Sequence, residues 1–266
     1  MSGNFAIQTG EIFFKYAKGK SQMTGKEFHT YYEIVFFISG NVEFIYEKGK
    51  ETLYPNTAVI IPKETFHQFN ILGVENDYTR CVFNFKSVSE LDQLILTKLS
   101  KIMLIRNDKI NELFKSLMTI ETLNISENET NILLKALFAE ILVAINKESS
   151  VSQRHSKSFN AKVEAALSLI NQNLNEPLTL PDIASALNIS ESYLSHIFKK
   201  DMHISVHKYI LQKRLLAAHK KIEDSIPPVQ AAYESGFNDY SGFYTQFKKT
   251  FGVSPSKVNF KKRPVK

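Results

Sequence analysis

The sequence of 266 residues contains a single cysteine, Cys81. One cysteine excludes an intramolecular disulfide framework and is typical of proteins in a reducing compartment. The first twenty residues hold no basic segment followed by an apolar run, so we expect no signal peptide. The sequence has no low-complexity segment and no apolar stretch long enough to cross a bilayer. We therefore expect a soluble cytoplasmic protein with no membrane partner.

Acidic residues are scarce in the second half of the chain. Residues 151–266 hold 17 Lys and Arg against 9 Asp and Glu, a net charge of +8, whereas residues 1–150 hold 16 and 18, a net charge of −2. This asymmetry indicates an anionic partner for the second half alone. Nucleic acid is the first candidate and an anionic membrane surface the second, while a solvated lysine-rich surface is the alternative without a partner.

The first hundred residues have the pattern of short strands. Residues 29–40, 41–72 and 78–85 carry aromatic and β-branched runs that are broken by glycine, proline and asparagine. Short strands with turn signals at regular spacing favour a β-sandwich or a small barrel. With 43% apolar residues, the chain can build a packed core.

A helical pattern follows, most clearly over residues 126–148. Ser126 and Glu129 predict a capping box at its start. Its apolar stripe recurs at three- and four-residue steps and consists of Leu134, Leu137, Phe138, Ile141, Leu142 and Ile145. Such a helix packs either on its own domain alone or also on a second copy of the chain, and Leu123 and Leu133 lie off the stripe. We expect a homodimer formed through helices in residues 89–147.

The polar, serine-rich segment between these halves predicts an interdomain linker. We expect an N-terminal domain over residues 1–146, a linker over 147–159 and an all-helical domain over 160–266.

Two short helices joined by a tight turn are predicted over residues 178–200. Thr179 and Asp182 form a capping-box pair, Asn188 suits a left-handed turn position, and Ser190 caps the second helix. Leu194, Ile197 and Phe198 would be buried, leaving a polar face outside. This is a helix-turn-helix, and its exposed second helix suits the major groove of DNA.

The same plan recurs over residues 227–252. Pro227 and Pro228 begin a helix, Gly236 occupies the turn, and Asn238 or Asp239 caps the next helix. The buried stripe of that helix is predicted to be Phe243, Phe247 and Phe251. A helix over residues 207–223 would separate the two units, so that both recognition helices enter successive major-groove segments about 34 Å apart.

Residues 160–260 resemble the AraC/XylS family of bacterial transcription regulators. The residues that carry the resemblance are Leu180, Ile183, Ala184, Ser190, Tyr193, Leu194, Phe198, Lys199, Lys200, Tyr209, Arg214, Ala218, Gly236, Phe237, Asp239, Phe243, Phe247, Lys248, Lys249, Phe251, Gly252 and Pro255. The resemblance implies a DNA-binding module that usually activates transcription and contacts RNA polymerase. The chain departs from the family's usual pattern at His203, where glycine is common, and at Gly242 and Thr245.

The two helix-turn-helix units together give the candidate DNA-binding residues. We expect base readout by Ser192, Ser195, His196, Tyr240, Ser241, Tyr244 and Thr245. We expect phosphate contacts from Lys199, Lys200, Arg214, Lys248 and Lys249. Gly242 would let the DNA approach the helix closely.

The first half is similar to the cupin-like sensory barrel found in many members of this family, with appended α-helices. His29, Glu33 and His67 match positions of the two cupin motifs, although the paired His-x-His of metal-binding cupins is reduced to one histidine. The resemblance implies a small organic effector held by His29, Tyr31, Glu33 and His67, with no metal and no cofactor. Hydrogen bonding of the three side chains to one another, and a divalent ion with open positions, are the alternatives. By the same analogy, the segment from Phe5 to Phe14 would act as an arm over the ligand.

The sequence therefore predicts a regulator that binds promoter DNA and responds to an effector, and not an enzyme. A metal-dependent cupin enzyme and an effector-independent DNA binder are the alternatives. The target promoters, the effector and the sign of regulation are not contained in the sequence.

Overall fold

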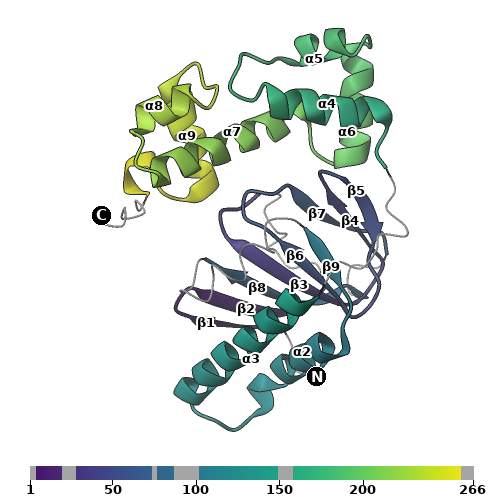
Figure 1. The fold of residues 1–266 in the computed structure, drawn as a ribbon, viewed down its shortest axis with the longest axis vertical. Helices are drawn as coiled ribbons and strands as arrows, with labels where there is room; N and C mark the ends of the chain where they lie inside the picture. Colours follow the sequence, from purple (N-terminus) through teal and green to yellow (C-terminus); the bar gives the residue numbers. More distant parts are fainter. Residues whose placement is uncertain (1–3, 20–27, 74–76, 87–101, 149–157, 259–266) are drawn as a thin grey trace. The chain divides into compact units, whose positions relative to one another are not determined.

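The computed structural model describes residues 4–19, 28–73, 77–86, 102–148 and 158–258, which divide into a unit ending at residue 157 and a unit beginning at residue 158 (Figure 1). Most of the predicted linker, residues 147–159, lies outside the described residues, so its boundaries stay a prediction. No helix among the described residues is long and apolar enough to cross a membrane.

The N-terminal unit is built on two antiparallel sheets. The larger sheet runs in the order β1 (Phe5–Thr9), β2 (Ile12–Lys18), β8 (Thr79–Phe85), β3 (Tyr32–Ser39), β6 (Thr57–Ile61) and β9 (Met103–Ile105). The smaller sheet runs in the order β5 (Gly49–Thr52), β4 (Val42–Tyr46) and β7 (His67–Ile71). The β-rich N-terminal domain predicted from the sequence is therefore confirmed.

The predicted barrel is not confirmed, because no ladder joins the two sheets among the described strands. The strands β4, β5 and β7 pair only with one another: β4 and β5 form a hairpin, and β7 pairs antiparallel with the other edge of β4. Their inner residues, such as Phe44 and Tyr46, pack against Val35, Phe37 and Ile61 of the larger sheet. The observed architecture is a sandwich with a filled interior over this part of the sheets.

The N-terminal segment predicted as an arm is part of the larger sheet instead. The strand β2 pairs with β8 over seven residues, from Ile12 opposite Phe85 to Lys18 opposite Thr79, and β1 pairs with β2. The ring of Phe14 is fully buried against Phe83, with the ring centroids 4.8 Å apart. The prediction missed these strands because both faces of β2 are partly buried, which blurs the alternation.

Helices cover the outer face of the larger sheet. Figure 1 shows α2 (Asp108–Met118) and α3 (Glu127–Lys147) side by side there, linked through the short 3-10 helix η3 (Ile120–Thr122). Since side chains alternate across a strand, Ile34 and Phe36 of β3 face these helices, whereas Val35 and Phe37 face the smaller sheet. The predicted capping box of Ser126 and Glu129 is present at the start of α3.

The C-terminal unit consists of helices. They are α4 (Ala161–Gln172), α5 (Leu180–Ala186), α6 (Glu191–Met202), α7 (Val206–Glu223), α8 (Pro228–Tyr233), α9 (Tyr240–Phe251) and the 3-10 turn η4 (Pro255–Lys257). The pairs α5–α6 and α8–α9 are the two predicted helix-turn-helix units, and α7 joins them. The all-helical prediction is confirmed.

Local signals in the sequence account for the ends of these helices. Thr179 and Asp182 form the predicted capping box of α5, and Ser190 caps α6. Of the two caps considered for α9, Asp239 accepts from the backbone amides of Ser241 and Gly242. The turn residues Asn188 and Gly236 have φ angles of 53° and 84°, in the left-handed region.

Candidate DNA-binding surface and ligand site

The second helix of the first unit, α6, separates cleanly into two faces. Leu194, Ile197 and Phe198 are buried, as the sequence predicts. The predicted base-reading and phosphate side chains are all exposed on its remaining surface, namely Ser192, Ser195, His196, Lys199 and Lys200. The helix therefore presents hydroxyl, imidazole and ammonium groups to a partner, and each can hydrogen-bond to DNA.

His203 ends this helix in an unusual conformation. Its φ is 54°, and its backbone amide donates to the carbonyl oxygen of Lys199. A left-handed residue at a helix C-terminus is most often glycine, because a Cβ is disfavoured there. The departure at His203 therefore leaves the backbone turn intact and adds a side chain to it.

In α9, the predicted base-reading residues differ in how accessible they are. Ser241, Tyr244 and Thr245 are exposed, whereas Tyr240 is half-buried, with its ring 5.6 Å from that of Phe243. The hydroxyl of Thr245 donates to the carbonyl oxygen of Ser241 at 3.0 Å, so that proton is engaged within the helix. Tyr244 and Ser241 are thus the more available polar groups of this face.

Gly242 has a local structural role that the sequence does not reveal. Its amide donates to Asp239 Oδ2, and a Cβ added at this glycine would lie 2.8 Å from the same oxygen. The missing side chain leaves room for the carboxylate that caps the helix. The prediction that Gly242 admits DNA is therefore not needed to explain the residue.

Among the predicted phosphate contacts, Lys248 and Lys249 are exposed near the end of α9. Arg214 is engaged within the protein instead. Its Nε donates to the carbonyl oxygen of Leu174 at 2.9 Å, and an Nη donates to that of Glu176 at 2.7 Å. These bonds hold the guanidinium against the segment between α4 and α5, and a phosphate would compete with them.

The predicted effector residues gather in the N-terminal unit. His29 Nε2 lies 3.5 Å from Glu33 Oε2, and His67 Nε2 lies 3.1 Å from the same oxygen. All three residues are buried, with exposed fractions of 2% for His29, 6% for Glu33 and 1% for His67. Tyr31 is half-buried, and its ring stacks on that of His29 with centroids 4.0 Å apart.

The cluster lies where the two sheets meet. Glu33 belongs to β3 of the larger sheet, whereas His67 begins β7 of the smaller one. The amide of Glu64 donates to the carbonyl oxygen of His29 at 2.7 Å, which holds the segment before β3 against the segment before β7. Residues distant in the sequence are thus brought to one point by the pairing of the sheets.

Each histidine of the cluster is oriented by the backbone. His29 Nδ1 lies 2.7 Å from the carbonyl oxygen of Tyr31, and His67 Nδ1 lies 3.1 Å from that of Thr65. Both Nε2 atoms therefore face Glu33, but within the described part of the chain neither has a hydrogen-bond partner of suitable direction. The Nε2–Oε2 distances are therefore close contacts and not well-directed hydrogen bonds.

Asn84 is a functional candidate that the sequence did not reveal. In the orientation that satisfies its amide, it donates to Glu33 Oε1 at 3.1 Å, which leaves Oε2 facing the histidines. The two residues are cross-strand neighbours of β3 and β8. The only signal that could identify Asn84 is its register opposite Glu33, and that register is known only once the pairing of the strands is known.

The electrostatics of the cluster favour an ionised carboxylate. Burial alone would raise the pKa of Glu33, but its contacts with His29 and His67 outweigh this effect and lower the pKa to about 2. Burial lowers the pKa of His29 although Glu33 opposes the shift, and burial raises the pKa of the Tyr31 hydroxyl. The carboxylate of Glu33 is thus ionised at neutral pH.

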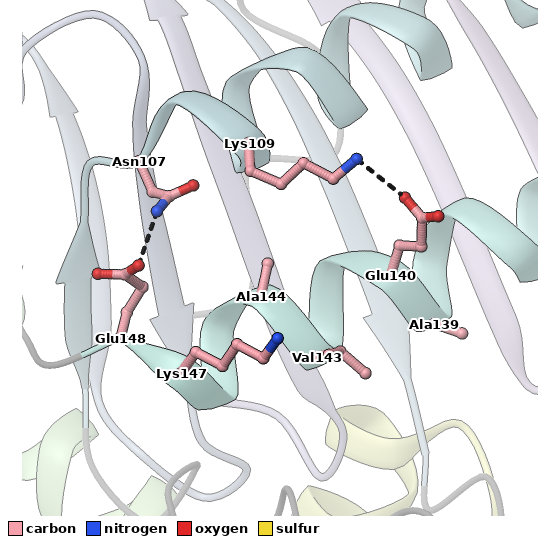
Figure 2. A pocket seen from close by; sticks show the side chains of 8 residues that line it. All are labelled: Asn107, Lys109, Ala139, Glu140, Val143, Ala144, Lys147 and Glu148. Atoms are coloured by element: carbon pink, nitrogen blue, oxygen red, sulfur yellow. Dashed lines mark hydrogen bonds and ion pairs between the residues drawn. The ribbon is translucent and has the colours of Figure 1, made fainter.

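Helix α3 exposes apolar residues on its outer side. Ile132 and Val143 are 69% and 46% exposed, and with Ala136 and Ala139 they recur at steps of four, three and four residues. A groove of about 450 Å³ lies over the end of this stripe, and Figure 2 shows the side chains that line it. Two contacts border the groove, Lys109 to Glu140 at 3.4 Å and Asn107 to Glu148 at 2.6 Å.

Residues 183–259 match the family model described as a helix-turn-helix domain. The chain is 29% identical over 233 residues to the Msm operon regulatory protein of Streptococcus mutans, covering 81% of this chain and 82% of that protein. It is 26% identical over 144 residues to the HTH-type transcriptional activator RhaR of Mannheimia succiniciproducens, covering 52% and 51%. Among solved structures, ToxT from Vibrio cholerae matches over 96% of each chain, with 15% identity and a TM-score of 0.39.

The matched segment contains both helix-turn-helix units almost entirely, and its relatives are regulators of transcription. Their names agree with the geometry of α6 and α9, which present polar and basic side chains on exposed faces. The protein is thus a DNA-binding regulator of transcription. These matches support the resemblance to the AraC/XylS family that the residues of its two helix-turn-helix units carry.

Proposed function

We propose that this regulator is a homodimeric activator that reads promoter DNA with both helix-turn-helix units and responds to a small effector bound in its N-terminal unit. The observation that carries the proposal is the pair of exposed polar faces on α6 and α9 within one compact helical unit. Because promoter DNA is the partner, we place the protein in the cytoplasm.

Sequence reading would be divided between the two recognition helices. Ser192, Ser195 and His196 of α6 would contact base edges in one major-groove segment. Ser241 and Tyr244 would do so in the next, with Thr245 as an acceptor and Tyr240 at the margin. The 18 residues of α7 make a spacer of about 27 Å, a length suited to two segments on one side of the duplex.

Non-specific affinity would come from the lysines at the ends of these helices. Lys199 and Lys200 lie in the last turn of α6, and Lys248 and Lys249 lie in the last turn of α9. All four side chains are exposed. Contacts of this kind fix the orientation of a protein on the duplex without reading its sequence. Arg214 is left out of this set because its guanidinium is bound to backbone carbonyls.

The cluster of His29, Glu33 and His67, with Tyr31 stacked beside it, supports an effector site at the junction of the two sheets. Buried polar atoms without hydrogen-bond partners are costly unless a ligand satisfies them. An effector that bound one arrangement of the protein more tightly would shift the population toward it.

Dimerisation would use the outer stripe of α3. A second copy of the chain suits this surface because Ile132, Ala136, Ala139 and Val143 follow the spacing of helix-helix packing. Contact with RNA polymerase and activation follow from the family resemblance, and one matched relative is itself named an activator.

Genome-wide footprinting with the full-length protein, with and without candidate metabolites, tests this function. We expect discrete promoter sites that contain two short boxes, and a changed occupancy with one class of metabolite. The double variant Ser195→Ala, His196→Ala should lose protection at one box and keep it at the other. Equal affinity for unrelated DNA sequences would instead favour the effector-independent architectural binder.

A further inference from the structure

The buried cluster of the N-terminal unit consists of groups that all offer lone pairs to one point. A carbonyl oxygen can only accept, so the Nδ1 atoms of His29 and His67 that face carbonyls must carry the ring protons. In the neutral rings, each Nε2 is then an acceptor that lies close to Glu33 Oε2. Three acceptors that converge in a buried place require a cation between them.

A proton on one imidazole is the simplest such cation, but the contacts do not suit it. An imidazolium would donate a directed N–H bond to the carboxylate, and charge-assisted bonds of this kind are short and straight. Across the described residues, neither His29 Nε2 nor His67 Nε2 makes a bond of that direction. Atoms arranged around a shared centre, and not pointed at one another, are what a bound ion requires.

We infer that His29 Nε2, His67 Nε2 and Glu33 Oε2 bind one divalent first-row transition-metal ion. Their ligand atoms lie within 4.8 Å of one another, and all three residues are buried. Two imidazoles and one carboxylate are the donor set that zinc and ferrous iron accept, with positions left open for a further ligand. This inference differs from the expectation of the family resemblance in adding a metal ion, and it keeps the organic effector.

The surroundings of the three ligands support the assignment. Metal-binding histidines usually donate their other N–H to a carbonyl or carboxylate, which fixes the ring, and both histidines here face carbonyls. Asn84 holds the second carboxylate oxygen of Glu33, and the ring of Tyr31 stacks on His29. Asn84 is therefore a positioning residue of the site and not a ligand.

Because the ligands come from both sheets, the bound ion would also cross-link the two sheets. Glu33 lies on β3 of the larger sheet and His67 on β7 of the smaller one. An open position on the ion would accept a carboxylate or hydroxyl oxygen of the effector. This last step rests on the proposed function, whereas binding of the ion does not.

The test uses full-length protein without an affinity tag, prepared free of metal and titrated with Co²⁺ followed by Zn²⁺. We expect about one equivalent of Co²⁺ with visible absorption bands, displaced by Zn²⁺, and a raised melting temperature. His29→Ala and His67→Ala should abolish these bands, and Asn84→Ala should weaken binding about tenfold. Glu51→Gln, a buried carboxylate elsewhere in the same unit, and His207→Ala, an exposed histidine, are controls that should bind normally.

Binding of less than about a tenth of an equivalent by folded wild-type protein would overturn the inference, and so would bands that persist in both histidine variants. If the variants fail to fold, the wild-type titration and the folded Asn84→Ala variant still decide the question. Footprinting of metal-free protein separates the metal site from the proposed function. If the protein bound specific DNA sites but took up no metal, the metal site would be refuted and the proposed function would stand.

Discussion

The turn of the second helix-turn-helix unit lies directly against the side chain of Arg214. A Cβ added to Gly236 would lie 2.8 Å from Arg214 Nε and 2.7 Å from the carbonyl oxygen of Leu174, which that Nε donates to. The arginine of α7 thus bridges the segment after α4 and the turn between α8 and α9. This contact joins the two DNA-binding units through the helix between them.

Substitution of Gly236 is expected to disrupt this contact. Gly236→Ala combines a positive φ of 84° with two collisions, so we expect a loss of about 3 kcal/mol or more in unfolding free energy. Gly252→Ala is the matched control, because its φ is 77° and its Cβ would meet nothing within 4 Å. Only about 1 kcal/mol should be lost there. Urea unfolding followed by far-ultraviolet circular dichroism measures both, and equal losses would refute the collision.

Arg214→Lys distinguishes a positioning role from a phosphate contact. A lysine keeps the charge but cannot bridge the carbonyl oxygens of Leu174 and Glu176 as the guanidinium does. We expect a stability loss of about 1 to 3 kcal/mol and weaker binding to sites with two boxes, with the salt dependence unchanged. Binding to a single box should change little. If the lysine variant bound the full site as well as wild type does, the bridge would not matter.

Lys249→Ala should weaken binding to every DNA sequence. The side chain is exposed in the last turn of α9, where it can neutralise a phosphate. Loss of one such contact reduces the slope of log K against log salt by about 0.9. Lys135→Ala, an exposed lysine of α3, is the control for net charge and should leave the slope as it is. An unchanged slope for Lys249→Ala would remove this residue from the phosphate contacts.

His196→Ala should affect specific binding more than non-specific binding. The imidazole is exposed on α6 between Ser192 and Lys199, facing away from the buried side. We expect a loss of about 1 to 3 kcal/mol on the preferred site and relaxed selectivity at one base pair. A series of base substitutions measured by mobility shift locates that pair. The role fails if the variant ranks the substituted sites as wild type does.

Ile132→Asp should separate the proposed dimer. A carboxylate at the most exposed apolar position of α3 would be buried without a partner in the interface, at a cost of about 2 kcal/mol or more. Analytical ultracentrifugation should then show a dissociation constant raised at least about thirtyfold. Leu123→Asp, at an exposed leucine off the stripe, should leave the dimer intact. Equal behaviour of the two variants would move the interface elsewhere.

Local chemistry made the helical half predictable. The caps at Thr179, Ser190 and Asp239 and the left-handed turns at Asn188 and Gly236 act within a few residues of one another. Such signals can be recognised without knowledge of distant contacts. The exposed and buried faces of α6 and α9 followed from helical periodicity in the same way.

The N-terminal half is harder to predict from the sequence, because its strands are defined by partners far away in the sequence. Apolar runs in the sequence indicate the segments containing β3, β4, β6, β7 and β8, whereas the family analogy predicts an arm where β1 and β2 lie. Whether the strands close into a barrel depends on which edges pair, and the described strands form two sheets. Register is set by tertiary packing, which short-range patterns do not encode.

The sequence by itself determined the basic second half and the two polar recognition faces, because these depend on composition and on periodicity within single helices. Tertiary structure alone decided which side chains meet. It brought Asn84 to Glu33 across a strand pair and joined His67 to them from the other sheet. It also joined the guanidinium of Arg214 to the backbone of the segment after α4, since hydrogen bonding to carbonyls depends on where the folded chain places them.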